Sequence, residues 1–402
     1  MKKSLFGWGN TTKSIAKSGG WDIYDDKFDE NWSDQFGNRL LPPKDFNADL
    51  SELEIPSPGF PPHHDLVKKA KNLISEYDYF NDTTPLKIWI SGTNGKTTTT
   101  QMIGFLLKKQ GGIIGGNVGT PLGDLDKNAK IWILETSSFT VHYTKFATPN
   151  LYVLLPITPD HLSWHGSFKE YENTKLKPLL NMKTGSLALI PKKYENFENV
   201  KNSLAKVIFY ENEDDLAKLA EIKISDIKFE TPFLIDALLA LCVQRILFDE
   251  VDFELLNSFK IEGNKLEILQ DSFKRTWVND TKATNIDAAI QALKRYKNKK
   301  IHLILGGDDK GVDLSPVFEV ASKMDVKIYA IGRNYQKILN LCECFKIQSV
   351  SCEFLQNAVN EISKNLQIDE IALLSPACAS LDQFKSYAER GDKFKEFIAL
   401  LK

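Results

Sequence analysis

The sequence is poor in cysteine, with five in 402 residues. An odd, small number of cysteines in a long chain predicts reduced thiols and a cytoplasmic location rather than a disulfide framework. Cys342, Cys344 and Cys352 cluster loosely, but a Cys-x-Cys pair without a matching second pair does not by itself indicate zinc.

Long apolar runs and an excess of basic charge are also missing. No apolar run approaches the roughly 20 residues of a membrane span, and the segment 1–7 becomes polar too soon for a signal peptide. The formal net charge of -2 gives no electrostatic basis for nucleic-acid binding. We therefore expect a globular protein with neither a nucleic-acid partner nor a membrane span. We also expect it to be a monomer.

The length exceeds that of one ordinary core and predicts two or three domains. Residues 1–84 contain a strand, a glycine turn and a helix of the dinucleotide-binding type, with Thr12 where a third glycine would stand. Residues 85–262 hold a glycine-rich loop between apolar runs. The strand–helix rhythm begins again in residues 263–402, which end in a helix expected over 381–400. We predict an α/β protein of three domains: a Rossmann-like N-terminal domain, a central P-loop ATPase-like domain with a mostly parallel sheet, and a Rossmann-like C-terminal domain.

Short, largely apolar runs predict strands, and the continuous runs of the central region suit strands that are covered on both faces. The expected strands lie at 4–6, 21–25, 53–55, 87–90, 131–134, 151–155, 301–305, 326–331 and 371–374. Ligands of such parallel sheets bind at the carboxyl ends of the strands, so polar residues that follow these runs are candidates for a site.

The most informative stretch is 87–100, in which an apolar run, a glycine turn and a helical pattern follow one another. This is how a phosphate-binding loop is built: backbone N–H groups face an anion, Lys96 adds a positive charge, and Thr97 can ligate Mg²⁺. Ile90 stands where the longest form of the motif has glycine, so only the short form, Gly-Thr-Asn-Gly-Lys-Thr, is present. The alternative is a glycine turn that caps a helix and leaves Lys96 in solvent.

Other polar residues follow the apolar runs of the central region. Glu135 could hold the metal of a phosphate loop, or be a charge in solvent. Asn117 lies among glycines that let the backbone approach a ligand, or is a simple turn residue. His161 and His165 could suggest a hydrolase metal site, although a phosphate loop favours a Mg²⁺ site with one histidine. Lys175, on pattern alone, is a solvated helix lysine.

Five segments together resemble the Mur ligase superfamily. The phosphate loop at 92–98, the Glu-Thr-Ser-Ser-Phe run at 135–139 and the Asp-His pair at 160–161 carry the general resemblance. The segments 279–285 and 374–384 are similar to those of the branch that adds D-glutamate. Folylpolyglutamate synthetases share the ATPase core, but we do not associate them with the last motif.

The resemblance implies an ATP-dependent ligase of cytoplasmic peptidoglycan precursor synthesis. In the branch that adds D-glutamate, ATP phosphorylates the carboxylate of UDP-N-acetylmuramoyl-L-alanine, and the amine of D-glutamate attacks the acyl phosphate. The implied cofactors are ATP, two Mg²⁺ ions and a carbamylated Lys175. Two alternatives stay open: another amide ligase of the superfamily, such as a folylpolyglutamate synthetase, or a nucleotide-regulated binding protein that does not catalyse.

The resemblance also assigns residues. The implied catalytic residues are Lys96, His161, Lys175 and Lys282. The implied ATP-binding residues are Gly92, Thr93, Asn94, Gly95, Lys96, Thr97, Thr98, Lys265 and Asp280. The implied metal ligands are Thr97, Glu135, His161 and Lys175. The implied contacts to the UDP substrate are Asn10, Thr11, Asp25, Lys27, Asn117 and Ser137. The implied contacts to D-glutamate are Thr284, Lys310, Ser380, Leu381 and Tyr387.

Three positions depart from the family pattern. Lys265 replaces the usual arginine, which keeps the charge but loses the bidentate fork. Tyr387 stands where phenylalanine is frequent, and Thr140 stands where glutamine is common, so the family's contacts do not carry over directly to these two positions.

Overall fold

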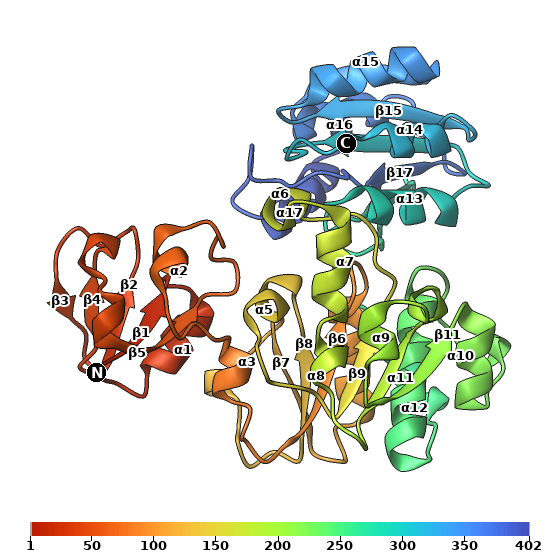
Figure 1. Ribbon diagram of the computed structural model, residues 1–402. Coiled ribbons are helices and arrows are strands. Elements are labelled where there is room, and N and C mark those ends of the chain that lie inside the picture. Colours follow the sequence, from red (N-terminus) through yellow and green to blue (C-terminus); the bar gives the residue numbers. More distant parts are fainter. Residues whose placement is uncertain (1, 402) are drawn as a thin grey trace. The chain divides into compact units, whose positions relative to one another are not determined.

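The computed structural model describes residues 2–401, and the chain divides into two compact units, Met1–Phe259 and Lys260–Lys402. The first unit contains a five-stranded and a six-stranded sheet, and the second unit contains a six-stranded sheet (Figure 1). Each sheet is mostly or wholly parallel and helices accompany it, which confirms the predicted α/β class. The domain boundaries at residues 84 and 262 stay a prediction.

The N-terminal sheet has the strand order β3-β4-β2-β1-β5. All neighbours are parallel except β3 and β4. The strands are β1 (Lys2–Phe6), β2 (Trp21–Tyr24), β3 (Trp32–Ser33), β4 (Arg39–Leu41) and β5 (Ser51–Pro56). The helices of this part are α1 (Asn10–Ala16), α2 (Asp65–Lys69) and α3 (Glu76–Tyr79).

Thr12 stands where a third glycine would stand, and its side chain holds the turn before α1 together. Its side chain is fully buried. The hydroxyl donates to the Gly7 carbonyl at 2.6 Å and accepts from the Gly9 amide at 3.1 Å. The turn is therefore closed by a side chain rather than by close backbone packing.

The central sheet is wholly parallel, with the order β11-β10-β9-β6-β8-β7. Its strands are β6 (Leu86–Ser91), β7 (Gly112–Gly116), β8 (Ile131–Glu135), β9 (Leu151–Leu154), β10 (Leu187–Pro191) and β11 (Lys206–Tyr210). Alternate residues serve two cores. Ile88 and Ile133 face the helices α4 (Lys96–Leu106) and α11 (Phe233–Phe248), whereas Trp89 and Trp132 pack in a separate core. Burial on both faces explains why these runs are continuously apolar.

Shorter helices complete the first unit. They are α5 (Ser138–Tyr143), α6 (Leu162–His165), α7 (Phe168–Leu176), α8 (Pro178–Asn181), α9 (Glu198–Lys201), α10 (Glu213–Ala220) and α12 (Phe253–Asn257). Single 3₁₀ turns occur at Pro43–Asp45, Ala48–Leu50, Leu122–Asp124, Lys192–Tyr194 and Ile224–Asp226.

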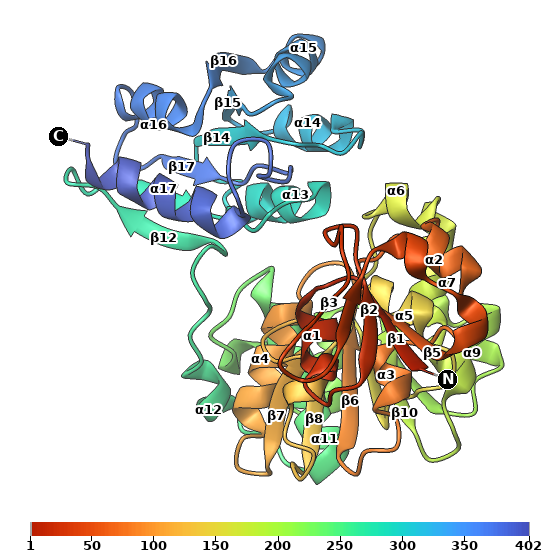
Figure 2. The ribbon, with the colours of Figure 1, turned by 90° about the vertical axis from the view of Figure 1, so that its left-hand side faces the viewer.

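The second unit has the strand order β12-β13-β17-β14-β15-β16, in which only β12 runs antiparallel to its neighbour. The strands are β12 (Glu267–Gln270), β13 (Thr276–Asn279), β14 (Ile301–Gly306), β15 (Val326–Ile331), β16 (Gln348–Glu353) and β17 (Ile371–Leu374). The helices are α13 (Ile286–Arg295), α14 (Ser315–Ala321), α15 (Tyr335–Phe345), α16 (Leu355–Ser363) and α17 (Tyr387–Ala399). Helices α16 and α17 contact each other and share one apolar core with the sheet, and α13 contacts α14 (Figure 2).

The predicted start of the last helix is wrong. The helix was expected from Leu381, but α17 begins at Tyr387, and the residues before it form turns. The Ser386 side chain accepts from the Glu389 amide and caps the helix there, while the Asp382 carboxylate accepts from the Arg333 amide at 2.7 Å. The turn thus makes hydrogen bonds outside the helix, which a continuous helix would have to give up.

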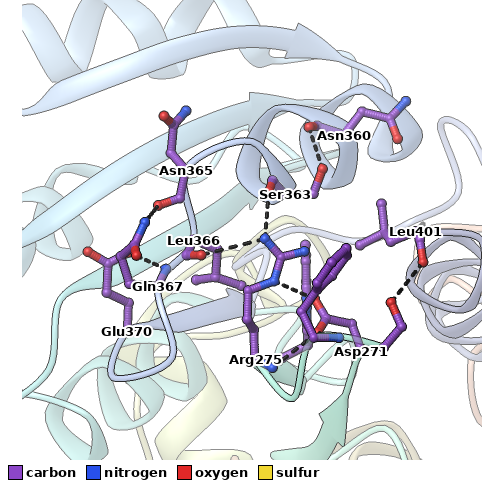
Figure 3. A network of polar contacts seen from close by, with 12 residues as sticks. Asp271, Arg275, Asn360, Ser363, Asn365, Leu366, Gln367, Glu370 and Leu401 are labelled. Carbon is purple, nitrogen blue, oxygen red and sulfur yellow. Dashed lines mark hydrogen bonds and ion pairs between the residues drawn. The ribbon is translucent and has the colours of Figure 1, made fainter.

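Arg275 joins the β12–β13 turn to the end of α16 (Figure 3). Its Nε donates to Asp271 Oδ2 at 2.7 Å, and its Nη1 donates to the Ser363 carbonyl at 2.6 Å. Asp271 also accepts from Trp277 Nε1 at 2.9 Å. One guanidinium therefore makes a charge-assisted hydrogen bond to Asp271 and also satisfies a carbonyl at the end of a helix.

A second polar network lies inside the same unit, at His302. Its Nδ1 lies 2.9 Å from the Tyr329 hydroxyl, and its Nε2 lies 2.8 Å from Glu370 Oε2. Lys300 Nζ donates to the other Glu370 oxygen at 2.8 Å. Burial opposes ionisation of Glu370, but bonds from Lys300, from the Gln367 amide and from His302 outweigh it and lower the pKa to about 2.

We expect Glu370→Gln to destabilise the protein by about 1–3 kcal/mol at neutral pH, because buried His302 and its neighbouring donors lose a charged acceptor. A lowered carboxyl pKa gives stability that is present above the ordinary value of 4.5 and is lost as the pH falls through about 2. The difference between wild type and variant should therefore shrink between pH 5 and pH 2. Calorimetry of the full chain checks this, with the surface variant Glu361→Gln as control. A difference that is constant over this range would refute the account.

Within residues 2–401, no helix has both the length and the apolar composition needed to cross a membrane.

Candidate active site

The carboxyl ends of four central strands bring the predicted residues of the first unit to one edge. The phosphate loop follows β6, Asn117 follows β7, Glu135 ends β8, and His161 lies in the loop after β9. Strand β6 lies between β8 and β9, and β7 borders β8. Because all these strands are parallel, their carboxyl ends share one side of the sheet.

The phosphate loop has the backbone that an anion cradle needs. Gly92 and Gly95 have φ values of 137° and 85°, which favour glycine. A Cβ on Gly92 would lie 2.6 Å from the Leu155 Cβ, so this glycine also permits close packing. Lys96 is the first residue of α4, with Thr97 and Thr98 in the same turn, and its Nζ donates to the Thr93 carbonyl at 2.7 Å. Backbone N–H groups in the first turn of a helix can bind phosphate oxygens.

Asp236, which the sequence analysis missed, lies under this loop. It is buried in α11 and accepts from the Thr99 hydroxyl at 2.8 Å. A Cβ on Gly95 would lie 2.3 Å from Asp236 Oδ1. An acid within the otherwise apolar run 233–243 was the sequence signal that could have identified it.

Glu135 is only 3% exposed. Its Oε1 accepts from Asn117 Nδ2 at 2.8 Å, while its Oε2 has no hydrogen-bond partner among the described residues. The interpretation of Glu135 as a solvent charge is therefore wrong. A buried carboxylate with one open oxygen suits a cation ligand.

Lys175 is buried, so its interpretation as a solvated lysine is wrong. It is 1% exposed, with its Nζ 3.4 Å from Ser91 Oγ and 4.8 Å from the centre of the Tyr171 ring. Burial, and secondly the charge of Lys96, hold the pKa of this amine well below its ordinary value. The amine is thus favoured in its neutral, nucleophilic form.

The two histidines have different surroundings. His161 has a φ of 53°, and its Nε2 lies 3.6 Å from Asp160 Oδ2. His165 Nε2 lies 3.0 Å from the Ser138 hydroxyl. Burial, and then neighbouring histidines, lower the pKa of His165 to about 4. His165 is therefore neutral at physiological pH, and His161 is the partly exposed imidazole at this edge.

These residues fit a magnesium–nucleotide site rather than a preformed metal cage. Among residues 2–401, no three histidine, cysteine or acidic side chains are grouped closely enough to hold an ion by themselves. Glu135 Oε2 and the Thr97 hydroxyl would have to be joined by phosphate oxygens, as in other phosphate loops. The five cysteines are free thiols, as predicted.

The N-terminal sheet carries a cavity of about 230 Å³ at the carboxyl end of β1. Asp25 and Lys27 line it, as predicted contacts of the UDP substrate, together with Trp8 and Phe60. Asp25 accepts from the Trp8 amide at 2.6 Å and from the Lys27 amide at 2.9 Å. Asn10 and Thr11 begin α1 beside this turn, and Ser137 caps α5 in the central part. Trp8 and Phe60 were not predicted as part of a site, because each is a half-buried aromatic in a turn, where no periodic pattern marks it.

The predicted D-glutamate residues of the second unit follow adjacent strands. Thr284 follows β13, Lys310 follows β14 and Ser380 follows β17, which lies between the other two strands. The loops after β14 and β17 are held together, because Asp308 and Ala379 exchange two backbone hydrogen bonds of 2.9 and 3.0 Å.

The side chains in these loops differ in exposure. Lys310 is exposed and has a φ of 51°, whereas Ser380 is 3% exposed. Leu381 is 67% and Tyr387 is 38% exposed. Lys282 Nζ lies 5.6 Å from the centre of the Tyr387 ring. The structure thus presents cations around a loop edge, which suits an anionic ligand.

Asp280 and Lys265 are the two predicted nucleotide residues of this unit, and Asp280 makes a hydrogen bond to the segment that carries Lys265. Asp280 accepts from the Ser375 hydroxyl at 2.7 Å and from the amide of Leu266, which follows Lys265, at 3.2 Å. Burial raises the pKa of Asp280 to about 7, against the effect of these bonds. Oδ1 of Asp280 therefore holds the segment that carries Lys265, and Oδ2 holds the loop after β17.

Arg390 is a further residue that the sequence analysis missed. It is 1% exposed and donates to the Thr281 carbonyl at 3.0 Å and to the Cys378 carbonyl at 3.1 Å. It thereby clamps the loops that precede Thr284 and Ser380. Burial lowers the pKa of this guanidinium to about 10.

Comparison with known proteins agrees with this arrangement. Residues 90–244 match the Mur ligase middle domain. Among solved structures, MurF ligase from Thermotoga maritima in complex with ADP has a TM-score of 0.60 at 17% identity, covering 98% of this chain and 97% of that chain. E. coli FolC in complex with DHPP and ADP has a TM-score of 0.61 at 16% identity, covering 85% and 99%. Fold and phosphate loop together define a protein of the Mur ligase class.

Sequence relatives define the family more narrowly. The UDP-N-acetylmuramoylalanine--D-glutamate ligase of Campylobacter jejuni subsp. jejuni serotype O:23/36 (strain 81-176) is 57% identical over 403 residues, which is 99% of both chains. The protein of the same name from Helicobacter pylori (strain ATCC 700392 / 26695) is 46% identical over 419 residues, again 99% of both. The chain belongs to the UDP-N-acetylmuramoylalanine--D-glutamate ligase family.

Proposed function

We propose that this protein joins D-glutamate to UDP-N-acetylmuramoyl-L-alanine at the expense of ATP, in cytoplasmic peptidoglycan precursor synthesis. The full-length identity of 57% to a ligase of that name carries the proposal. The phosphate loop, with buried Lys175 and Glu135 at the same sheet edge, is the chemistry that it requires. We propose that the protein acts as a monomer.

The proposed reaction has two steps. The γ-phosphoryl group of ATP passes to a carboxylate oxygen of the acceptor, and ADP leaves. The neutral amine of D-glutamate then attacks the acyl carbon, phosphate leaves, and the amine loses a proton. A carboxylate is a poor electrophile, and the first step gives it a good leaving group.

The first step brings two anions together, and cationic groups must screen their repulsion. We assign this role to Lys96 and the amides of the phosphate loop, Gly92 to Thr98. Mg²⁺ bound at Thr97, Glu135, His161 and modified Lys175 would supply further positive charge there. Lys265 and Asp280 are assigned to the rest of the nucleotide, and Lys282 to the reaction centre.

Carbamylation would convert Lys175 from a cation into an oxygen-donor anion. The neutral amine attacks the carbon of CO₂, an N–C bond forms, one oxygen takes the negative charge, and a proton leaves Nζ. The burial of Lys175 and its lowered pKa support this reaction, because only the neutral amine is nucleophilic.

The second step needs a site for two carboxylates. We assign one carboxylate of D-glutamate to Lys310 and Thr284, and the other to Ser380, with Leu381 and Tyr387 beside it. Two anchors leave one enantiomer with its amine aimed at the acyl carbon. L-Glutamate and the shorter D-aspartate should therefore be rejected.

Lys310→Ala should raise the KM for D-glutamate by a factor of about 10–100, since a charge-assisted hydrogen bond is lost. The KM for ATP should change little, because the phosphate loop belongs to a different unit. Lys323→Ala removes another exposed lysine of the same unit and serves as control. A raised KM for ATP with D-glutamate unaffected would move Lys310 to the nucleotide site.

The alternative of a folylpolyglutamate synthetase has less support. Its solved representatives are only 12–16% identical to this chain, which reflects the shared fold. A phosphate-release assay with UDP-N-acetylmuramoyl-L-alanine and a panel of D-glutamate, L-glutamate, D-aspartate and a folate acceptor separates the possibilities. Turnover only with the UDP acceptor and D-glutamate is expected. Turnover only with the folate acceptor, or with none, would overturn the proposal.

A further inference from the structure

Asn117 donates two hydrogen bonds to Glu135. Its backbone N–H donates to the Glu135 carbonyl at 2.9 Å, and its side-chain Nδ2 donates to Glu135 Oε1 at 2.8 Å. The two residues lie at the carboxyl ends of the paired strands β7 and β8. One residue thus holds both the main chain and the carboxylate of Glu135.

The backbone at Gly116 allows Asn117 to come close enough to Glu135 for both hydrogen bonds. Gly116 has a φ of 87°, and a Cβ there would lie 2.5 Å from the Glu135 carbonyl oxygen and 2.8 Å from the Tyr77 hydroxyl. The Tyr77 hydroxyl itself donates to the same carbonyl at 3.2 Å. Any side chain at position 116 would push Asn117 away from Glu135.

These two hydrogen bonds use the carbonyl and Oε1 of Glu135 but not its Oε2. Glu135 Oε2 is buried and has no hydrogen-bond partner among residues 2–401. A buried acceptor without a partner destabilises the folded protein, and does so more strongly when it is charged. A divalent cation bound at Oε2 would supply the missing partner. The amide of Asn117 is a suitable partner for the other oxygen, because it donates without neutralising the carboxylate.

We infer that Asn117 is a positioning residue that directs Glu135 Oε2 toward a divalent cation, in addition to the substrate contact expected from the sequence. The inference rests on the proposed role of Glu135 as a metal ligand. It differs from substrate contact in its consequence, since it predicts an effect on cation affinity when no UDP substrate is present.

The test measures Mn²⁺ binding to the full chain with ADP, by electron paramagnetic resonance of the free ion. Mn²⁺ accepts the same oxygen ligands as Mg²⁺. Asn117→Ala should weaken Mn²⁺ binding about 10–100-fold, as loss of an outer-shell partner does. Asn181→Ala, which removes an amide donor to the Lys145 carbonyl at the surface, should leave binding unchanged. Asn117→Leu, similar in shape but without a donor, should repeat the loss if the alanine variant does not fold.

A double variant separates this inference from the proposed function. Glu135→Gln should weaken Mn²⁺ binding, and adding Asn117→Ala to it should have no further effect, because Asn117 acts through the carboxylate. If Glu135→Gln has no effect, the metal assignment in the proposed function is wrong. If Glu135→Gln weakens binding but the Asn117 variants bind Mn²⁺ within twofold of wild type and raise only the KM for the UDP substrate, Asn117 is a substrate contact alone.

Discussion

Lys175→Ala is expected to lower turnover by a factor of about 10³, the largest effect that we predict. Lys175 is 1% exposed and faces Ser91 and Tyr171, so alanine removes a group from the site rather than from the surface. If the amine carries a carbamate, the variant loses an oxygen ligand for the cation. Small carboxylates such as acetate should restore part of the activity by filling the space.

The control is Lys169→Ala, an exposed lysine of the same helix, which should keep full activity. Intact mass under CO₂-retaining conditions should show the adduct on wild type and not on Lys175→Ala. Full activity of the folded Lys175→Ala variant would return this residue to a structural role.

Lys175→Met should, in addition, raise the melting temperature measured in CO₂-free buffer at neutral pH. The pKa of the buried amine is lowered, so the unfolded state binds more protons than the folded state, and stability rises with pH. Methionine removes this penalty, and the gain should shrink as the pH rises toward the ordinary value of 10.5. A variant that is less stable than wild type at every pH would contradict the burial argument.

Lys96→Ala is expected to lower turnover by a factor of at least about 10², because a positive charge at the transferring phosphoryl group is lost. The fold should survive, since Lys96 is the first residue of α4 and only half-buried. Phosphate release by Lys96→Ala is compared with that of Lys108→Ala, an exposed lysine just beyond the same helix. Near-normal ligation by folded Lys96→Ala would remove the loop from the ATP site.

The strands illustrate how far local pattern reaches. Every strand that the apolar runs predicted is present within two residues of the expected bounds. Strands without such a run were missed, such as the glycine-rich β7 and the polar edge strand β16. Edge and glycine-rich strands are held by their neighbours rather than by their own composition, so no local pattern marks them.

Short motifs and apolar runs were enough to predict the phosphate loop, the family and the succession of the main strands along the chain, because these features are local. The burial of Lys175, the position of Asp236 under Gly95 and the hydrogen bond from Asn117 to Glu135 depend instead on tertiary packing. Asp236 and Gly95 are separated by 141 positions in the sequence. Such pairings arise when separate strands and helices pack against each other, and a helix lysine has the same local sequence whether its neighbours are solvent or another helix.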